Sequence, residues 1–426
     1  MSQLLIHLET HNLLEPFQSA YRKSHSTETA LLRVVNDLLM ASDRGHVSIL
    51  SLLDLSAAFD TIDHGILLQR LQYTFGCTGT ALGWFESYLT NRTQSVVIGP
   101  HQSSPSVLKY GVPQGSVLGP VLFVLYTQPL GGVMKQADVS YQRFADDSQL
   151  HDSDSPSNFP ELTSSVQNCI GDVSEWMVDN KLKMNNEKTE LIVTGTKHKL
   201  SQIPVSTMLI SDCHLSFSPS VKNLGIFLDQ TLSTETQINQ LCKVIYFQLR
   251  RLAKIRSFLT TEAANKLAVS LILSRLDYCN SVLSGLPQEK LCRLQWIQNH
   301  AARIMLRRSK RDSAVPLLRT LHWLPVRARI EYKVACLCHQ SLHNKDFPSY
   351  LSELIQPYHP PRALRSQDSF LLSVPRFSLN SYGKRSFSVF GPTLWNSLPL
   401  SLRTRQSLPT FKKHLKPHLF QQHLAS

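Results

Sequence analysis

The stretch 139-VSYQRFADDSQL-150 is typical of two strands joined by a tight turn, because aromatic and aliphatic residues give way there to polar turn formers. Asp146 and Asp147 fall at its tip. Two adjacent carboxylates repel each other unless a cation or a hydrogen-bond donor satisfies them. Magnesium suits such a place, since it takes a few carboxylates and otherwise keeps water or phosphate oxygens. Asp-Asp pairs also occur in solvated loops, so this interpretation depends on what lies upstream.

The composition describes a chain that can bury a sizeable core. Its 426 residues, 42% of them hydrophobic, allow two or three domains. None of the eight cysteines shows Cys-x-x-Cys spacing, so neither a disulfide framework nor a structural zinc site is indicated. The sequence has no signal-peptide pattern and no apolar run of about 18 residues. We therefore expect no membrane partner and a reducing compartment, the nucleus or the cytoplasm.

The charge is unevenly distributed along the chain. Residues 1–240 hold 15 Lys and Arg against 23 Asp and Glu, a net charge of −8. Residues 241–426 hold 29 against 8, a net charge of +21. A carboxylate-rich half joined to a strongly basic half suggests metal chemistry beside a polyanion-binding surface. A basic tail that only aids solubility is the weaker alternative at this bias.

An almost continuous apolar run, 47–55, predicts a strand buried on both faces. It places Asp54 at its end, where a carboxylate is costly unless it is paired or metal-bound. Asp54 is therefore the most informative carboxylate of the chain. We interpret Asp63 as the N-cap of the helix that follows and Asp60 as orienting the turn, and neither as a metal ligand.

Two further segments before residue 125 carry polar groups at turns. Arg22 and Lys23 precede a helix predicted over 27–41, and such a place can hold a phosphate, although surface cations are more often only solvated. The stretch 111-GVPQGSVLGP-120 predicts an irregular turn before a buried helix. Its Gly-flanked Gln114 presents an amide where a planar ligand can approach the backbone closely, but an ordinary turn also accounts for the pattern.

The rest of the chain changes from mixed to helical patterns. Helical spacing predicts a helix over 162–177, and strands are expected at 190–194 and 221–229. A helical region, 235–306, carries basic clusters that suit a phosphate-backbone grip, namely Arg250, Arg251, Lys254 and Arg256, and Arg303, Arg307, Arg308, Lys310 and Arg311. Residues 356–426, rich in Pro and Ser, are expected to be irregular and partly disordered. Cys336, Cys338, His339 and His343 lie on a helix-like run, and we interpret them as core and surface residues rather than as a zinc site.

In order and spacing, these motifs resemble those of a reverse transcriptase. The stretch 53-LDLSAAFD-60 matches the first catalytic motif of the family, 111–123 its Pro-Gln-Gly motif, and 144-FADD-147 its aromatic-x-Asp-Asp motif. The segments 181–194 and 221–229 fit later palm segments. Three further stretches, 276-LDYCN-280, 321-LHWLP-325 and 394-LWNSLP-399, resemble the C-terminal region of LINE-type retrotransposon enzymes, which lack long terminal repeats. The resemblance covers nearly the whole chain.

This resemblance implies an α+β fold, the right-hand polymerase with fingers, antiparallel palm and helical thumb, followed by a basic C-terminal extension. We expect partial fingers and palm over 1–230, a thumb-like helical domain over 231–345 and a basic, partly irregular region over 346–426. Measured against the family, Met1 falls inside the fingers, so their earlier segments are expected to be missing. Neither an endonuclease nor an RNase H domain is recognisable.

The resemblance also implies a catalytic metal cluster. Asp54 and Asp146 would bridge two Mg²⁺ ions, which Mn²⁺ can replace, with Asp147 completing the cluster and Leu55 adding a backbone carbonyl. Lys188 would protonate the leaving group. Such a centre performs in-line nucleotidyl transfer, in which one ion activates the primer hydroxyl and the other neutralises the triphosphate.

Nucleotide-binding roles follow from the same resemblance. Phe59 would be the steric gate against a ribonucleotide 2′-hydroxyl. Gln114 and Gly115 would contact the incoming nucleotide, and Arg22 and Lys23 its triphosphate. The implied partners are an RNA template, a DNA primer and deoxynucleoside triphosphates, held by the basic helices after residue 240; the sequence indicates no oligomeric state. The aromatic residue of the fourth motif is Phe144, where the family often has Tyr.

Three functions are compatible with these observations. The first is an RNA-directed DNA polymerase that extends a DNA primer on an RNA template. The second is a catalytically incompetent retrotransposon remnant that only binds nucleic acid through its basic half, which the missing fingers motivate. The third, a host polymerase copying DNA, is disfavoured by the C-terminal resemblance, and template preference would separate it from the first.

Overall fold

The computed structural model describes residues 1–56, 58–204, 207–210, 213–359 and 369–424. These residues form two compact units, each assembled from separate stretches of the chain. The first unit comprises Met1–Ser26, Ile49–Leu191 and Ile203–Ser218, and the second comprises Thr27–Ser48, Ile192–Gln202 and Pro219–Ser426. The three-part division at residues 230 and 345 stays a prediction.

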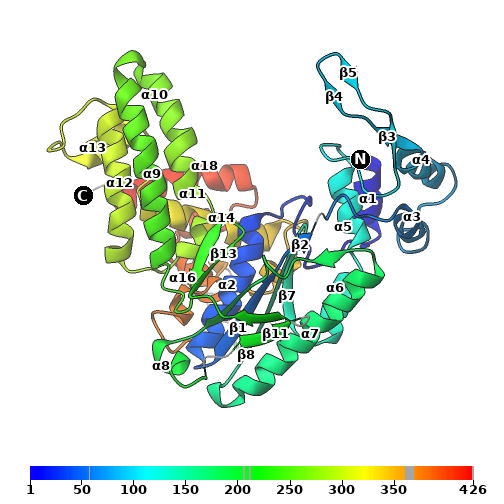
Figure 1. Cartoon of the computed structure of the whole chain (residues 1–426). Coiled ribbons are helices and arrows are strands. Elements are labelled where there is room, and N and C mark those ends of the chain that lie inside the picture. Colours follow the sequence, from blue (N-terminus) through cyan, green and yellow to red (C-terminus); the bar gives the residue numbers. More distant parts are fainter. Residues whose placement is uncertain (57, 205–206, 211–212, 360–368, 425–426) are drawn as a thin grey trace. The chain divides into compact units, whose positions relative to one another are not determined.

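A four-stranded sheet with the strand order β10-β1-β8-β7 contains the strands on either side of Asp146 (Figure 1). The strands are β1 (Val47–Leu53), β7 (Ser140–Phe144), β8 (Asp147–Asp154) and β10 (Glu190–Thr194). Strand β1 is buried along nearly its whole length, as expected for an apolar run with both faces covered. Strands β7 and β8 pair antiparallel with Phe144 opposite Asp147, so the predicted hairpin is confirmed and Ala145 and Asp146 form its turn.

The first unit also contains several helices. They are α1 (Ser2–Thr10), α3 (His64–Tyr73), α4 (Gly79–Leu89), α5 (Gly119–Tyr126), α6 (Leu130–Gln136), the 3₁₀ turn η1 (Pro156–Asn158) and α7 (Phe159–Asp179). Helix α7 packs against β8 and α6 through its apolar stripe. Helix α3 begins at the predicted cap, because the Asp63 carboxylate accepts a hydrogen bond from the Ile66 N–H at 3.0 Å. Short strand pairs complete the unit: β2 (Leu55–Ser56) with β9 (Lys183–Met184), and β11 (Thr207–Ile210) with β12 (Cys213–Ser216).

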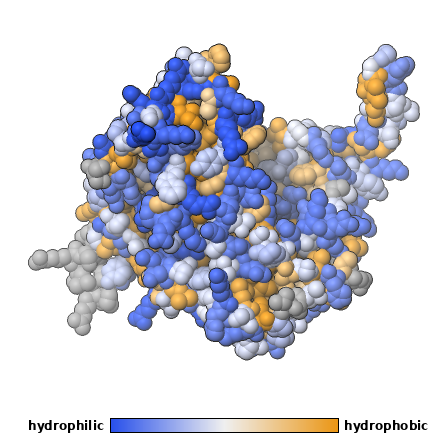
Figure 2. All heavy atoms as spheres, turned by 60° about the vertical axis from the view of Figure 1, so that its left-hand side comes forward, coloured by the Kyte–Doolittle hydropathy of each residue, from blue (hydrophilic) through white to orange (hydrophobic). Residues whose placement is uncertain are grey.

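A projecting ribbon follows α4 in the sequence (Figure 1). Its strands are β3 (Arg92–Gln94), β4 (Val97–Ile98), β5 (His101–Gln102) and β6 (Ser106–Leu108), with β3 paired to β6 and β4 to β5. Between β3 and β4, the Val96 N–H donates to the Ser103 side chain instead of to a strand partner. Val97 and Ile98 are 65% and 74% exposed, and hydrophobic atoms are visible near the tip of the projecting ribbon in Figure 2.

The second unit is mostly helical. Its elements are α2 (Thr27–Asp43), α8 (Lys197–Leu200), β13 (Ser220–Asn223), β14 (Ile226–Asp229), α9 (Glu235–Ile255), η2 (Arg256–Phe258), α10 (Thr261–Ala268), the π-helical η3 (Val269–Leu273), α11 (Ser274–Asp277), η4 (Asn280–Leu283), α12 (Gln288–Met305), α13 (Ala314–Thr320), α14 (Val326–His343), α15 (Ser349–Ser352), η6 (Gly383–Arg385), α16 (Phe387–Ser397), α17 (Leu400–Arg403) and α18 (Leu408–Leu424). Helix α9 packs against α12, and α14 packs against α16 and α18. Where a strand is expected over 221–229, the structure has two short antiparallel strands, β13 and β14.

The C-terminal region corrects the expectation of irregular structure over 356–426. Its described part contains α16, α17 and α18, and Trp395 and Phe411 are completely buried. Pro392 and Pro417 lie inside α16 and α18, so proline content masked a helical pattern that packing against α14 stabilises. The part of this expectation that concerns 360–368 lies outside the described residues.

Two other expectations concern α14 and the membrane. Cys336, Cys338 and His339 are buried in α14, as expected of core residues, and the His339 Nε2 lies 2.7 Å from the Arg405 carbonyl oxygen. None of the described helices combines the length and the apolar character needed to cross a membrane.

Candidate active site

The Asp146–Asp147 turn is held by a side chain from the N-terminal segment. Ala145 adopts a left-handed backbone conformation with φ of +57°, which is unfavourable for residues other than glycine. The amide of Gln18 contacts both backbone groups of this residue: its Oε1 accepts from the Ala145 N–H at 2.9 Å and its Nε2 donates to the Ala145 carbonyl at 3.1 Å. Gln18 is 1% exposed. It therefore fixes the turn that carries both carboxylates.

The backbone around Gln18 reinforces this clamp. The Arg143 N–H donates to the Phe17 carbonyl and the Ser19 N–H donates to the Arg143 carbonyl, each at 2.9 Å. Segment 17–19 thus runs beside β7 as a short parallel bridge. Arg143 is fully buried and donates to the Thr127 carbonyl at 2.8 Å; burial lowers the pKa of its guanidinium. The sequence reasoning missed Gln18, and its only signal is a Gln in a polar segment just before Arg22 and Lys23.

Asp54 lies directly after β1, as predicted. Its backbone carbonyl accepts from the Asn185 N–H at 2.9 Å, and Leu55 pairs with Met184 of β9. This pairing brings the 185–189 turn to Asp54, where the Lys188 Nζ lies 3.6 Å from the Asp54 Oδ2. That oxygen is buried and has no hydrogen-bond partner. Lys188 is 70% exposed, so this long contact leaves the carboxylate oxygen largely unsatisfied.

The three aspartates influence one another electrostatically. Burial raises the pKa of Asp146, and the nearby Asp54 carboxylate raises it further, whereas its own backbone N–H and Lys188 lower it. Burial of the carboxyl group together with Asp146 and Asp54 raises the pKa of Asp147 to about 6, although Asp147 as a residue is exposed. Burial is the main cause of these raised pKa values, and repulsion by the neighbouring carboxylates adds to it.

These groups match a divalent cation in chemistry. In the described part of the chain, no three His, Cys, Asp or Glu side chains are arranged as they stand to hold a metal ion. The donor set is nevertheless one that a hard cation prefers, since it consists of carboxylates, one of them with an orphaned buried oxygen. A bound cation would lower both pKa values, because it would offset the repulsion that adds to the effect of burial. The donor types of these residues suit such an ion, and their side chains would have to rearrange to bind it.

The Pro-Gln-Gly turn is attached to the turn that follows Asp54. The Gly111 N–H donates to the Ile62 carbonyl at 2.8 Å and the Val112 N–H to the Phe59 carbonyl at 3.0 Å. A side chain at Gly111 would meet the Asp60 carbonyl oxygen at 3.0 Å, so this close approach requires glycine. The Gln114 Nε2 donates to the Asp60 Oδ1 at 2.8 Å. The Asp60 carboxylate thus holds the Gln114 amide of this turn.

Phe59 and Gly115 occupy places compatible with their predicted roles. The Phe59 ring is half-buried and packs against Phe123 of α5, with 4.7 Å between ring centroids. Gly115 has φ of +78°, and a Cβ atom at this position would meet no other atom within 4 Å, so its backbone faces open space. A ligand can therefore approach the Gly115 backbone closely.

Arg22 and Lys23 differ in their surroundings. The Arg22 Nη1 donates to the Glu15 carbonyl at 2.8 Å and to the Gln18 carbonyl at 3.2 Å. Its guanidinium therefore braces the segment that bears the Gln18 clamp. Lys23 is exposed. The nearby Tyr21 is electrostatically coupled to Asp146: burial raises its pKa, and the Asp146 charge raises it further. Segment 17–23 thus lies close to the carboxylates.

The predicted basic clusters of the second unit need one correction. Arg256 is 6% exposed and donates to the backbone carbonyls of Met305 and Leu259, so it stabilises the end of α9 and is no surface cation. Its neighbours Arg250, Arg251 and Lys254 are exposed. The helical spacing could not distinguish them, because a buried arginine whose donors are satisfied by carbonyls carries the same sequence signal.

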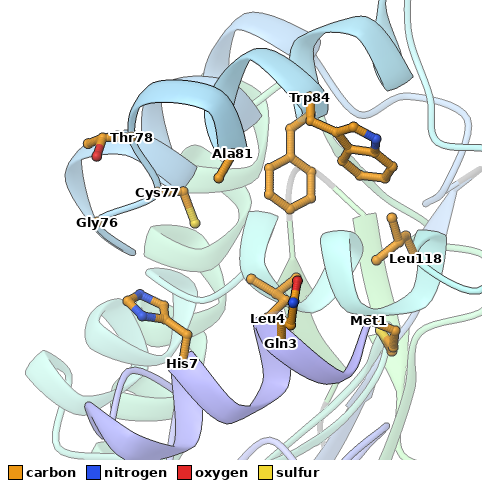
Figure 3. A pocket seen from close by; sticks show the side chains of 11 residues that line it. Met1, Gln3, Leu4, His7, Gly76, Cys77, Thr78, Ala81, Trp84 and Leu118 are labelled. Carbon is orange, nitrogen blue, oxygen red and sulfur yellow. The ribbon is translucent and has the colours of Figure 1, made fainter.

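A separate cavity of about 540 Å³ lies in the first unit, away from the aspartates (Figure 3). Figure 3 shows Leu4 and His7 of α1 facing Cys77 and Trp84, which come from the loop before α4 and from α4 itself. Among the described residues, no acidic side chain lines this cavity.

Comparison with known proteins identifies the family. Residues 1–228 match the family model described as "Reverse transcriptase (RNA-dependent DNA polymerase)", and the chain belongs to this family. It is 28% identical over 300 residues to a probable RNA-directed DNA polymerase from transposon BS of Drosophila melanogaster, covering 68% of this chain and 32% of that protein.

Two further relatives come from mobile elements. The chain is 26% identical over 247 residues to the RNA-directed DNA polymerase from mobile element jockey of Drosophila funebris, covering 57% of this chain and 26% of that protein. It is 26% identical over 316 residues to a probable RNA-directed DNA polymerase from transposon X-element of Drosophila melanogaster, covering 70% of this chain and 32% of that protein. The chain thus spans no more than 32% of the length of these relatives. The predicted kinship with LINE-type reverse transcriptases is confirmed.

Among solved structures, apo telomerase from Candida tropicalis aligns with a TM-score of 0.42 and 14% identity, covering 79% of this chain and 57% of that chain. This likeness is too low to support an argument by itself. Family membership and the mixed helices and strands confirm the predicted α+β right-hand polymerase class. Enzymes of this family use divalent metal ions.

Proposed function

We propose that this chain is the polymerase part of a retrotransposon reverse transcriptase, extending a DNA primer on an RNA template. The observation that carries the proposal is the aspartate cluster. Asp54 presents a buried oxygen with no hydrogen-bond partner, and burial together with the neighbouring carboxylates raises the pKa values of Asp146 and Asp147. Stability alone does not favour such an arrangement, whereas a metal-dependent active site requires it.

The proposed cofactor is a pair of Mg²⁺ ions, with Mn²⁺ able to replace them. Asp54, Asp146 and Asp147 would hold the ions, with the Leu55 backbone carbonyl as an additional ligand. When bound, the ions supply Lewis-acid stabilisation of the attacking hydroxyl and of the triphosphate. Because the chemistry is in-line transfer, the contribution of the protein is mainly to position groups and to balance charge.

The remaining residues have positioning roles in this proposal. Lys188, whose ammonium lies 3.6 Å from Asp54, would donate a proton to the departing pyrophosphate. Phe59, fixed against Phe123, excludes a 2′-hydroxyl. Gln114 and Gly115 approach the incoming deoxynucleotide through an amide and an open backbone.

Binding of the triphosphate and of the nucleic-acid strands requires cationic side chains. Lys23 and the Arg22-braced segment face the triphosphate in this proposal, and the exposed cations of α9 contact the template and primer. The net charge of +21 beyond residue 240 supports this, since phosphate contacts supply much of nucleic-acid affinity.

The test is primer extension on poly(rA)/oligo(dT) with Mg²⁺, comparing wild type with Asp146→Asn and with the matched control Asp172→Asn on the exposed side of α7. We expect extension by wild type and the control, and its loss in Asp146→Asn. Equal extension by all three proteins would refute the assigned site. RNA binding without extension by any of them would instead identify a remnant that only binds nucleic acid.

A further inference from the structure

A second polar pocket lies in the second unit, where two of the C-terminal motifs meet. The cavity has a volume of about 270 Å³. Asp277 and Asn280 from the motif 276–280 and His322 from the motif 321–325 line it, together with Arg329 and Lys333 of α14 and Lys416 of α18. The polymerase site described above uses none of these residues. Residues from two motifs that are distant in the sequence therefore line one cavity.

Two cations of this pocket are held by the protein itself. The Arg329 Nη1 donates to both carboxylate oxygens of Asp277, at 2.9 and 2.7 Å, and its Nε donates to the Leu324 carbonyl. These bonds fix the guanidinium and leave Nη2 for a ligand. The Lys333 Nζ pairs with the Glu28 Oε2 at 2.8 Å. Although burial lowers the pKa of Lys333, Glu28 and Asp277 raise it overall, so this lysine stays charged.

The third cation, Lys416, gives the pocket its surplus positive charge. No carboxylate of the described residues lies within ion-pair distance of its Nζ, which is 5.8 Å from the centre of the Phe420 ring. Burial and the neighbouring Arg329 lower its pKa. An ammonium group beside another cation at the mouth of a pocket favours an anion there.

Asn280 adds a requirement for a hydrogen-bond donor. It is 2% exposed, it lines the pocket, and its Oδ1 has no hydrogen-bond partner. Leaving a buried amide oxygen unpaired is unfavourable, so such a group calls for a donor from a ligand. The phosphodiester of a nucleic-acid backbone has no donor of its own. The pocket therefore suits an anion that carries a hydroxyl group close to it.

We propose that this pocket binds a ribose phosphate of single-stranded RNA. The phosphate oxygens accept from Lys416 and from the Arg329 Nη2, and a ribose 2′-hydroxyl donates to the Asn280 Oδ1. DNA lacks that hydroxyl, so the pocket favours RNA over DNA. The inference rests on the proposed function only in taking an RNA strand as the partner, and it places a contact outside the active site.

The test measures binding by fluorescence anisotropy, with a labelled single-stranded RNA and with DNA and 2′-O-methyl RNA of the same sequence. Affinity is measured between about 50 and 200 mM NaCl, because phosphate contacts make it depend on salt over this range. For Lys416→Gln, we expect the slope of log affinity against log salt to fall by about 0.7, the value for one phosphate contact on a single strand. Lys413→Gln, an exposed lysine on the same helix that does not line the pocket, should leave the slope unchanged.

The wild-type protein tests the hydroxyl contact without any mutation. We expect it to bind RNA about tenfold more tightly than 2′-O-methyl RNA and DNA, which lack the donor. Asn280→Leu should lower RNA affinity to that level without changing DNA affinity, with a thermal melt to confirm folding. Equal slopes for the Lys416 and Lys413 variants, or equal binding of RNA and 2′-O-methyl RNA, would overturn the proposal.

Two controls separate this inference from the polymerase assignment. If wild type extends primers while the Lys416 variant binds RNA like the Lys413 variant, only the pocket assignment fails. If wild type binds RNA through Lys416 but extends nothing, only the polymerase assignment fails. If AMP raises the melting temperature in a Lys416-dependent way while RNA binding does not depend on Lys416, the pocket is a mononucleotide site and the RNA assignment is wrong.

Discussion

The Gln18 clamp gives the sharpest prediction about the active site. In Gln18→Leu, a side chain of similar size replaces an amide that makes three hydrogen bonds: with the Ala145 N–H, with the Ala145 carbonyl and, through Oε1, with the Ala20 N–H at 3.0 Å. Gln18 and Ala145 are both buried, so water cannot easily replace these bonds. Each unsatisfied buried group costs about 1–3 kcal/mol.

We therefore expect Gln18→Leu to lower the free energy of unfolding by about 3–5 kcal/mol, allowing for partial relaxation of the three groups. The effect on turnover should be separable from stability. Without the clamp, Ala145 can leave its left-handed conformation and move Asp146, and displacing a catalytic group by about 1 Å can cost roughly 100-fold in rate.

The assay combines urea unfolding with primer extension well below the melting temperature. Gln136→Leu, the same substitution at an exposed position of α6, is the control and should change neither quantity. A Gln18→Leu protein that unfolds like wild type would refute the hydrogen-bond argument. One that is destabilised but turns over normally would show that the clamp supports the fold without positioning the carboxylates.

Three further predictions concern charge and packing. The pKa of folded Asp147 is raised to about 6, so the metal-free folded state binds the proton more tightly than the unfolded chain. The stability that this group contributes is therefore present at low pH and is lost as pH rises through about 6. The melting temperature of Asp147→Asn minus that of wild type should then increase between about pH 4 and pH 7, and a constant difference would contradict this. Trp395→Ala should lower the free energy of unfolding by about 3–5 kcal/mol in urea titrations, because Trp395 is completely buried; a loss under about 1 kcal/mol would mean that α16 is no part of the core. Arg256→Gln should lower the free energy of unfolding by about 2 kcal/mol or more, because it leaves the carbonyl groups that Arg256 binds unpaired, and it should not change the salt dependence of RNA binding. Arg250→Gln, at an exposed position, should weaken that salt dependence and leave the free energy of unfolding unchanged. If the two variants behave alike in unfolding and anisotropy assays, the distinction between a buried and a surface cation is wrong.

Local pattern was enough to predict the elements that carry the chemistry. The apolar run before Asp54, the turn at Asp146 and Asp147, and the cap at Asp63 were all predicted and lie where expected. In each case neighbouring residues decide the outcome, through alternation, turn chemistry or capping. The motifs in their order also sufficed to indicate the family, which the match over residues 1–228 confirms.

Long-range contacts decided the rest. That Gln18 clamps Ala145 across 127 positions, or that Asn280 and Lys416 line one pocket, depends on how distant segments pack, and no local pattern encodes it. The same holds for Arg256, whose burial turns a surface cation into a structural donor, and for α16 and α18, which form despite internal prolines because their apolar faces are covered. The sequence by itself determined which residues could do the chemistry; the tertiary structure decided which of them are held in place for it, because hydrogen bonds between distant segments exist only once the chain has folded.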